Sequence, residues 1–395
     1  IYFIMSLILF GLTSGAAVIT AQYWGKKDIE TIEKVLGISM RIGLVVGILF
    51  FAAAQFMPTV LMKIFTSEPV IIEEGVRYLR IVSWSYPLAA AAMVYLNIMR
   101  SVERVIISTL VYSISLVINV IFNAILIFGL GPAPALGVAG AACATVIAHV
   151  VEFGIVVFYI LRINRSVFFK LKNLFIREKA LMKDFKIYAL PVIFNELAWG
   201  TGISAIAAII GHLGSAAVAA NSITQVTRQL AIVVTMGVAN AAAIILGRTI
   251  GEKKEELAEI YAQRLVKLSG LLGIGGSVVV LCVRPMAQRF MTLTPEAGAY
   301  LHQMMIIMAF YVLCQSVDVT LIVGAFRAGG DTRVGLLLDF ISLWAICIPL
   351  GFVGAFFLKF PVWAVYLCLT CDEILKLPFA FARYRSRKWL KNITR

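Results

Sequence analysis

The chemistry available to this sequence depends on a few ionisable side chains inside long apolar stretches. Glu196 and Asp318 are the clearest, and Asn195 adds an amide beside the first of them. Pro191 precedes this pair and leaves a backbone carbonyl without its helical donor, which suits cation coordination. A carboxylate in apolar surroundings is costly, so each acid needs a hydrogen-bonding neighbour or a cation to bind. We therefore predict a cation or substrate site that includes Glu196, Asn195 and Asp318.

A second acidic group occupies the last apolar stretch. Lys376 follows Asp372 by four residues and Glu373 by three, so one of the two acids can pair with it along a helix. The surplus acid is then a candidate for proton transfer, and Glu152 holds the place of Glu373 in an internal repeat described below. Glu373, Asp372 and Glu152 are therefore candidates for a proton relay, with simple structural pairing as the alternative.

No arrangement of residues typical of catalysis occurs in the sequence. His149, His212 and His302 are scattered and lack the spacing of a metal-binding motif, and no glycine-rich phosphate loop is present. The six cysteines all lie in apolar stretches, and we interpret them as small core residues rather than disulfides or metal ligands. We therefore expect no enzyme activity, no metal centre and no organic cofactor.

Membrane-spanning helices must position these side chains. Hydrophobic residues make up 61% of the chain, charged residues make up 14%, and the mean hydropathy is +0.94. Eleven stretches are long enough to cross about 30 Å of hydrocarbon as helices. They cover residues 1–24, 35–57, 78–99, 105–128, 137–161, 186–210, 215–247, 265–283, 301–325, 334–357 and 362–382. Backbone polar groups in lipid must be paired internally, so we predict an all-α polytopic membrane protein.

Basic residues are distributed unevenly between the two ends of these segments. When the segments alternate in direction, 26 of the 35 Lys and Arg residues fall on one side and 6 on the other. Loops rich in Lys and Arg stay in the cytoplasm, so the linker 162–185 and the tail 383–395 are predicted to be cytoplasmic. This asymmetry also explains the net charge of +14, so we expect the lipid bilayer and not nucleic acid as a partner.

The two halves of the chain share a repeat with an offset of 226 residues. Residues 11–25 and 237–251 both begin and end with glycine, and Lys27 corresponds to Lys253. Each matched pair enters the membrane from the same side, so the halves are predicted to be parallel repeats of one helical bundle. Duplicated bundles are typical of secondary transporters, whose binding sites lie near the membrane midplane.

The repeat predicts two lobes joined by the basic linker at 162–185. The N-terminal lobe covers residues 1–161 with five helices, and the C-terminal lobe covers 186–395 with six. The glycine-bounded block lies in the first predicted segment of the N-terminal lobe but in the second segment of the C-terminal lobe. We therefore expect that the N-terminal lobe lacks its first helix and that eleven of twelve helices are present.

The sequence resembles the multidrug and toxic compound extrusion (MATE) family over nearly its whole length. The resemblance rests on the glycine-bounded blocks, on NVIFNAILIFGLGPAPALGVAGAACATVIA at 119–147, on FRAGGDTR at 326–333 and on RYRSRKWLK at 383–391. It implies two six-helix lobes, a V-shaped central cavity and efflux of cations driven by H⁺ or Na⁺. In one branch of the family, acids on the seventh and tenth helices bind the coupling cation, and Glu196 and Asp318 lie on the corresponding helices.

These features together predict an antiporter that exports organic cations or drugs in exchange for H⁺ or Na⁺. We expect a monomeric multi-pass protein of the cell inner membrane, with small cationic molecules and the lipid bilayer as its partners. A flippase for lipid-linked oligosaccharides is the alternative within transport, although it would need a cationic cavity and the deep charges here are mainly acidic. An intramembrane enzyme would need a paired nucleophile and base, and a structural or receptor-like membrane protein stays open.

Overall fold

The computed structural model describes residues 1–130, 134–176, 178–290 and 293–394, and all regular secondary structure among them is helical. Residues 131–133 of the 119–147 motif lie outside the described residues, as do Arg177 and Arg395 from the count of basic residues. The chain divides into two units, Ile1–Ile193 and Phe194–Arg395, with the division inside one long helix. The predicted all-α architecture is confirmed.

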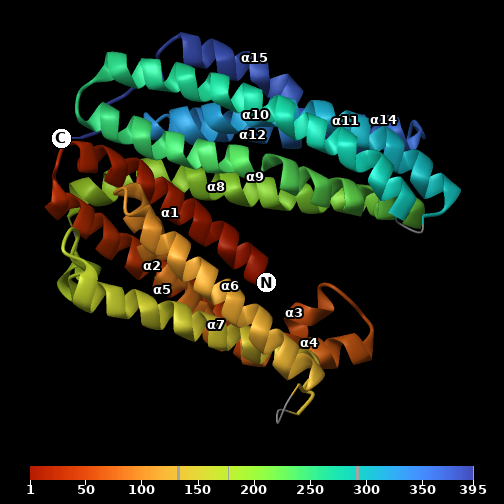
Figure 1. Ribbon diagram of the computed structural model, residues 1–395, viewed down its shortest axis with the longest axis horizontal. Coiled ribbons are helices and arrows are strands. Elements are labelled where there is room, and N and C mark those ends of the chain that lie inside the picture. Colours follow the sequence, from red (N-terminus) through yellow and green to blue (C-terminus); the bar gives the residue numbers. More distant parts are fainter. Residues whose placement is uncertain (131–133, 177, 291–292, 395) are drawn as a thin grey trace. The chain divides into compact units, whose positions relative to one another are not determined.

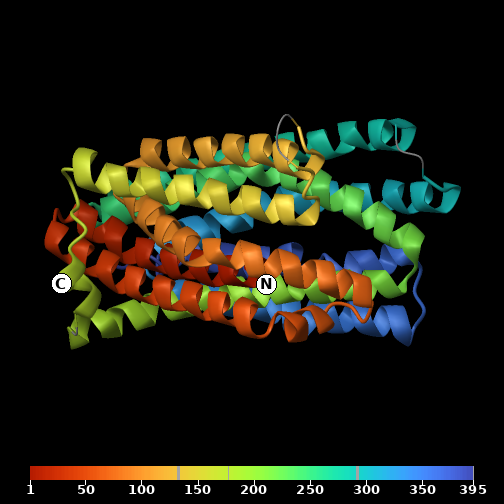
Figure 2. The ribbon, with the colours of Figure 1, turned by 90° about the horizontal axis from the view of Figure 1, so that it is seen from below.

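The N-terminal unit is a helical bundle (Figure 1). In chain order they are α1 (Tyr2–Gly25), α2 (Ile29–Phe56), α3 (Pro58–Lys63), α4 (Pro69–Val82), α5 (Tyr86–Ser101), α6 (Val105–Phe128) and α7 (Val138–Phe158). Two short 3₁₀-helices, η1 (Ser83–Ser85) and η3 (Leu171–Phe175), follow α4 and lie in the linker, respectively, and the π-helical η2 (Tyr159–Ile163) follows α7. Helices α1, α2 and α5 pack against one another, and α6 lies along α7, as Figure 2 also shows.

The C-terminal unit begins within α8 (Lys179–His212) and repeats this kind of packing. It continues with α9 (Ser215–Gly251), α10 (Glu255–Phe290), α11 (Pro295–Val319), η4 (Thr320–Phe326), α12 (Thr332–Phe340), η5 (Ile341–Cys347), α13 (Ile348–Phe356), α14 (Val362–Leu369) and α15 (Asp372–Arg385). Helices α9, α10 and α11 pack against one another, and α15 packs on α11. The elements η4 and η5 are π-helical, so the two helices that contain them depart from regular α geometry.

Ten helical stretches among the described residues are long and apolar enough to cross a membrane. The eleventh predicted segment, 362–382, is instead the two helices α14 and α15, separated at Thr370 and Cys371. Helix α8 begins at Lys179, seven residues before the predicted start. Lysine and alanine favour helix, so α8 extends past the apolar stretch from which its start was predicted.

The internal repeat reappears as equivalent packing in the two units. A Cβ atom placed on Gly47 would lie 3.0 Å from the Cβ of Ala90, between α2 and α5. The residues 226 positions after Gly47 and Ala90 are Gly273 and Ser316. A Cβ atom placed on Gly273 would lie 2.9 Å from the Cβ of Ser316. Small residues at the same places therefore bring the equivalent helices of both units into close contact.

The turns between equivalent helices also repeat. Lys27 and Lys253, 226 residues apart, follow α1 and α9 with φ of 64° and 61°. Glu103 and Gly330, 227 residues apart, take φ of 63° and 73° after α5 and after η4. Three of these four residues are not glycine, so the left-handed conformation is imposed by the helix-ending turn, whose backbone hydrogen bonds match in both units.

Part of the linker is folded against α2. The buried Glu33 carboxylate accepts hydrogen bonds from the backbone N–H of Phe168 at 2.9 Å and from Nζ of Lys170 at 2.6 Å. Asn173 is also buried, and it approaches Gly37 so closely that a side chain at Gly37 would collide with its backbone. This stretch of the linker is therefore a structured part of the N-terminal unit.

Candidate functional site

Lys376 lies at the centre of a group of buried acids in the C-terminal unit. Its Nζ is 2.8 Å from Asp339 Oδ1, 2.9 Å from Glu373 Oε2 and 3.9 Å from Asp372 Oδ2. The pairing within α15 that the spacing predicts is present, and α12 contributes a third carboxylate. One ammonium group is thus shared by three carboxylates in a site that is mostly excluded from solvent.

Asp339 also links this group to α8. Asn195 donates a hydrogen bond from Nδ2 to Asp339 Oδ2 at 2.9 Å, and the Asp339 side chain is only 17% exposed. Asp339 was not among the site residues predicted from the sequence. The signal that could have identified it is that Asp339 is the only acid in its predicted segment, 334–357. Asn195, by contrast, was predicted as a site residue and lies in the acidic group.

Asp318 lies beside the same group and has no compensating donor. The side chain is fully buried, and neither carboxylate oxygen receives a hydrogen bond within the described part of the chain. The carboxyl of Glu373 and the ammonium of Lys376 lie close enough to Asp318 to interact with it electrostatically. Two carboxyl groups in such a position are best accommodated by a shared proton or a small bound cation, because two adjacent buried negative charges repel each other.

Glu373 connects the acids to polar side chains of α11 and α9. Tyr311 Oη and Gln315 Nε2 each donate to Glu373 Oε1 at 3.4 Å. Gln315 in turn accepts a hydrogen bond from Arg228 Nη1 at 3.2 Å, and Gln225 accepts one from Arg228 Nε at 2.9 Å. The structure buries Arg228 inside the unit, with the residue 8% exposed. Its guanidinium is stabilised there by glutamine oxygens, which a sequence pattern could not reveal.

Glu196 has a different partner. Its Oε1 accepts a hydrogen bond from Arg327 Nη2 at 2.8 Å, and both side chains are largely buried. Adjacent residues on a helix point about 100° apart, so Asn195 reaches the acidic group while Glu196 turns toward Arg327. Among the described residues, Glu196 and Asp318 make no direct contact with each other. The ion-pair partner of Glu196 is therefore Arg327, on the helical turn that follows the segment of Asp318.

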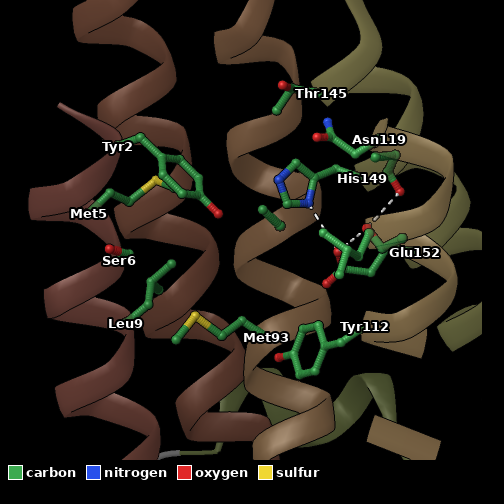
Figure 3. Close-up of a pocket in the computed structure, with 14 residues that line it drawn as sticks. Tyr2, Met5, Ser6, Leu9, Met93, Tyr112, Asn119, Thr145, His149 and Glu152 are labelled. Atoms are coloured by element: carbon green, nitrogen blue, oxygen red, sulfur yellow. Dashed lines mark hydrogen bonds and ion pairs between the residues drawn. The ribbon is translucent and has the colours of Figure 1, made fainter. Parts of the chain in front are cut away.

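The N-terminal unit contains a cavity of about 370 Å³ that holds the sixth predicted residue, Glu152 (Figure 3). Glu152 is buried and accepts hydrogen bonds from Ser115 at 3.2 Å and from His149 Nδ1 at 3.1 Å. The cavity is lined by α1, α5, α6 and α7, through Tyr2, Met5, Ser6, Leu9, Ala89, Met93, Tyr112, Ser115, Leu116, Asn119, Thr145, Ala148, His149 and Glu152.

This lining suits an amphiphilic cation. Figure 3 shows Tyr2 and Met5 on one wall, with His149 and Glu152 opposite them and Tyr112 and Met93 below. Aromatic rings and thioethers attract lipophilic cations, and a buried carboxylate supplies the opposite charge. Sequence reasoning identified Glu152 but missed the cavity, although His149 one helical turn earlier was a signal of a polar face on α7.

Comparison with known proteins gives consistent matches over most of the chain. A family model described as MatE matches residues 1–125 and 191–353. The uncharacterized transporter YisQ of Bacillus subtilis (strain 168) is 22% identical over 392 residues, which cover 98% of this chain and 84% of YisQ. The multidrug resistance protein MdtK of Yersinia pseudotuberculosis is 26% identical over 287 residues, covering 72% of this chain and 63% of MdtK.

Solved structures match the fold at lower sequence identity. A crystal structure of a MATE protein in a bent conformation superposes with a TM-score of 0.88 at 17% identity, covering 98% of this chain and 85% of the other. An outward-facing MATE family multidrug transporter gives a TM-score of 0.83 at 18% identity, with 98% and 85% coverage. These structural matches support the helical architecture described above.

Proposed function

Because this chain belongs to the MatE family, we propose that it is a secondary antiporter that exports small organic cations across the cell inner membrane in exchange for H⁺ or Na⁺. The observation that carries this proposal is Asp318, a fully buried acid without a hydrogen-bond donor in the described part of the chain and within electrostatic reach of Glu373. Two buried carboxyl groups placed close together favour uptake of a proton or a small cation, which is the property of a coupling site.

The acidic group supplies a means of responding to that ion. When Asp318 and Glu373 hold H⁺ or Na⁺, the negative charge around Lys376 decreases, and its ammonium is held mainly by Asp339 and Asp372. When the ion leaves, Lys376 is drawn back toward Glu373. Asp339 is bonded to Asn195 of α8, so this exchange is transmitted from α15 and α11 to α12 and α8. Movement of these helices is the proposed link between ion binding and transport.

The cavity around Glu152 is the proposed place for the exported molecule. Glu152 supplies a counter-charge for an amine, while Tyr2, Tyr112 and Met93 contact the apolar body. An acidic, aromatic cavity favours cations over the pyrophosphate head group that an oligosaccharide flippase would bind. The sequence relatives include proteins named for multidrug resistance, which is consistent with an amphiphilic substrate.

Transport in proteoliposomes tests this proposal. The product of the complete gene is reconstituted, and uptake or release of the fluorescent cation ethidium is followed under an imposed pH gradient or an imposed Na⁺ gradient, one at a time. We expect movement under one gradient and its collapse by the matching ionophore. Absence of movement under both gradients, with protein that is folded and inserted, would contradict the antiporter.

A further inference from the structure

Two cysteine side chains of the C-terminal unit lie in contact. The Sγ atoms of Cys347 and Cys371 are 3.3 Å apart, and neither residue forms a disulfide in the structure. Cys347 is fully buried, whereas Cys371 is partly exposed. A disulfide has an S–S length of about 2.05 Å, so the two sulfurs need to approach by only about 1.3 Å to bond.

The two thiols lie where both of their helices are irregular. Cys347 ends the π-helical turn η5 and precedes α13, and Cys371 lies in the break between α14 and α15. The neighbouring packing is tight, since a side chain on Gly351 of α13 would collide with Leu369 at the end of α14. The backbone around the thiol pair is therefore held in place on both sides.

We propose that Cys347 and Cys371 are a redox-modified pair that forms a reversible disulfide with hydroperoxides that enter the membrane. The partly exposed Cys371 sulfur attacks one oxygen of the hydroperoxide, the O–O bond breaks, and an alcohol leaves, so that Cys371 becomes a sulfenic acid. The Cys347 thiol then attacks this sulfur, the S–S bond forms, and water leaves. Two thiols and one hydroperoxide thus give one disulfide, one alcohol and one water.

The position of the pair next to the acids around Lys376 means that a disulfide would affect those acids. Asp372 and Glu373 directly follow Cys371 in the first turn of α15, and Lys376 lies one turn further. A covalent bond from Cys371 to Cys347 ties this turn to the start of α13 and restricts movement of the acids. The effect on transport rests on the function proposed above, in which the acids around Lys376 change partners. Oxidation is then expected to slow export, and reduction to restore it.

Cys368 is the competing partner, because it precedes Cys371 by three residues. The Cys371 thiol contacts the backbone carbonyl oxygen of Cys368 at 3.2 Å. A hydrogen bond to this carbonyl fixes the direction of the Cys371 side chain but brings no second sulfur to it. The sulfur in contact with Cys371 is that of Cys347, so the structure assigns the disulfide to that pair.

Thiol counting in variants with two cysteines tests the assignment. The first variant retains Cys347 and Cys371, the second Cys368 and Cys371, and the third Cys347 and Cys368, with every other cysteine replaced by alanine. Each purified protein is treated with cumene hydroperoxide in nanodiscs, denatured and labelled with a maleimide that shifts its mobility on a gel. We expect the first variant to lose both reactive thiols and to regain them with dithiothreitol, while the other two retain theirs.

Several results would overturn the proposal. They are retention of both thiols by the first variant, disulfide formation in the second instead, or a disulfide between two protein molecules. A separate transport measurement compares the wild type with Cys347→Ala, and we expect hydroperoxide to slow only the wild type, reversibly. If the disulfide forms but export is unchanged, the proposal that oxidation of this pair slows transport is wrong. If no variant exports even when reduced, the proposed function fails, while the thiol count still decides the disulfide.

Discussion

Arg327 Nη2 lies 2.8 Å from Oε1 of Glu196, in an ion pair whose side chains are 5% and 13% exposed. The two residues are 131 positions apart, so they connect α8 to the end of the π-helical turn η4. The pair shows that Glu196, the leading cation ligand in the sequence, already has a positive partner within its own unit. Glu196 is therefore expected to contribute to the stability of the unit as well as to transport, and mutation can separate these two contributions.

Glu196→Gln is expected to lower the thermal stability of the protein, since it leaves the buried Arg327 guanidinium without its carboxylate. Breaking a buried ion pair costs on the order of 3 kcal/mol. The double variant Glu196→Gln with Arg327→Gln should recover part of this loss because it removes both charges. Thermal unfolding of the detergent-purified proteins measures the cycle, and additive losses in the double variant would show that the pair is not coupled.

Asp318→Asn is expected to abolish gradient-driven export while leaving folding intact. The carboxylate has no hydrogen-bond donor to lose among the described residues, and an amide cannot take up the coupling ion. Glu296→Gln, an exposed acid at the start of the same helix, is the matched control and should transport normally. Export and thermal stability are measured on both proteins, and normal export by Asp318→Asn would remove Asp318 from the coupling site.

Glu152→Gln is expected to weaken binding of a cationic substrate, with about a tenfold rise in KM, which corresponds to about 1.4 kcal/mol. The reason is loss of the counter-charge in the cavity of the N-terminal unit. Thr145→Val changes another residue of the lining without changing its charge and serves as the control. Export is measured over a range of ethidium concentrations, and equal KM values for both variants would argue against cation binding at Glu152.

Gly329→Ala is expected to destabilise the end of the C-terminal unit where the chain's tail packs against the turn after η4. A methyl group at Gly329 would collide with the backbone carbonyl oxygen of the almost fully buried Trp389. Overpacking of this kind costs about 1–3 kcal/mol. Gly275→Ala is the matched control, because no atom lies within 4 Å of the added methyl there. The prediction is checked by thermal unfolding, where Gly275→Ala should match the wild type; equal melting temperatures for the two variants would refute it.

Cysteine labelling tests the predicted orientation. Asn173 is unsuitable in the linker because it is buried, whereas Lys172 beside it is exposed. In a cysteine-free background, Lys172→Cys should react with an impermeant maleimide only after the cells are permeabilised. Lys63→Cys, exposed on the predicted outer side, should react on intact cells. The reverse pattern of labelling would invert the topology.

The sequence by itself was sufficient to predict the membrane-spanning helices. A stretch of some twenty apolar residues must be helical in lipid whatever surrounds it, because its backbone groups can only be paired internally. The break at Thr370 and Cys371 was not predicted, since neither residue is a glycine or a proline, the residues that most often interrupt a helix. Pairing of Lys376 with the acids of its own helix could also be predicted, because residues three and four apart share one helical face.

Only the tertiary structure decided which polar side chains meet across helices. Asn195 and Asp339 are 144 residues apart, and Glu196 and Arg327, which form an ion pair, are 131 residues apart. A helix that is apolar on every side has no polar face to fix its rotation, so its sequence cannot tell in which direction a single acid points. That direction is set by close packing of small residues such as Gly273 against Ser316. The sequence therefore determined the helices and the acids within them, and packing determined the partners of each acid.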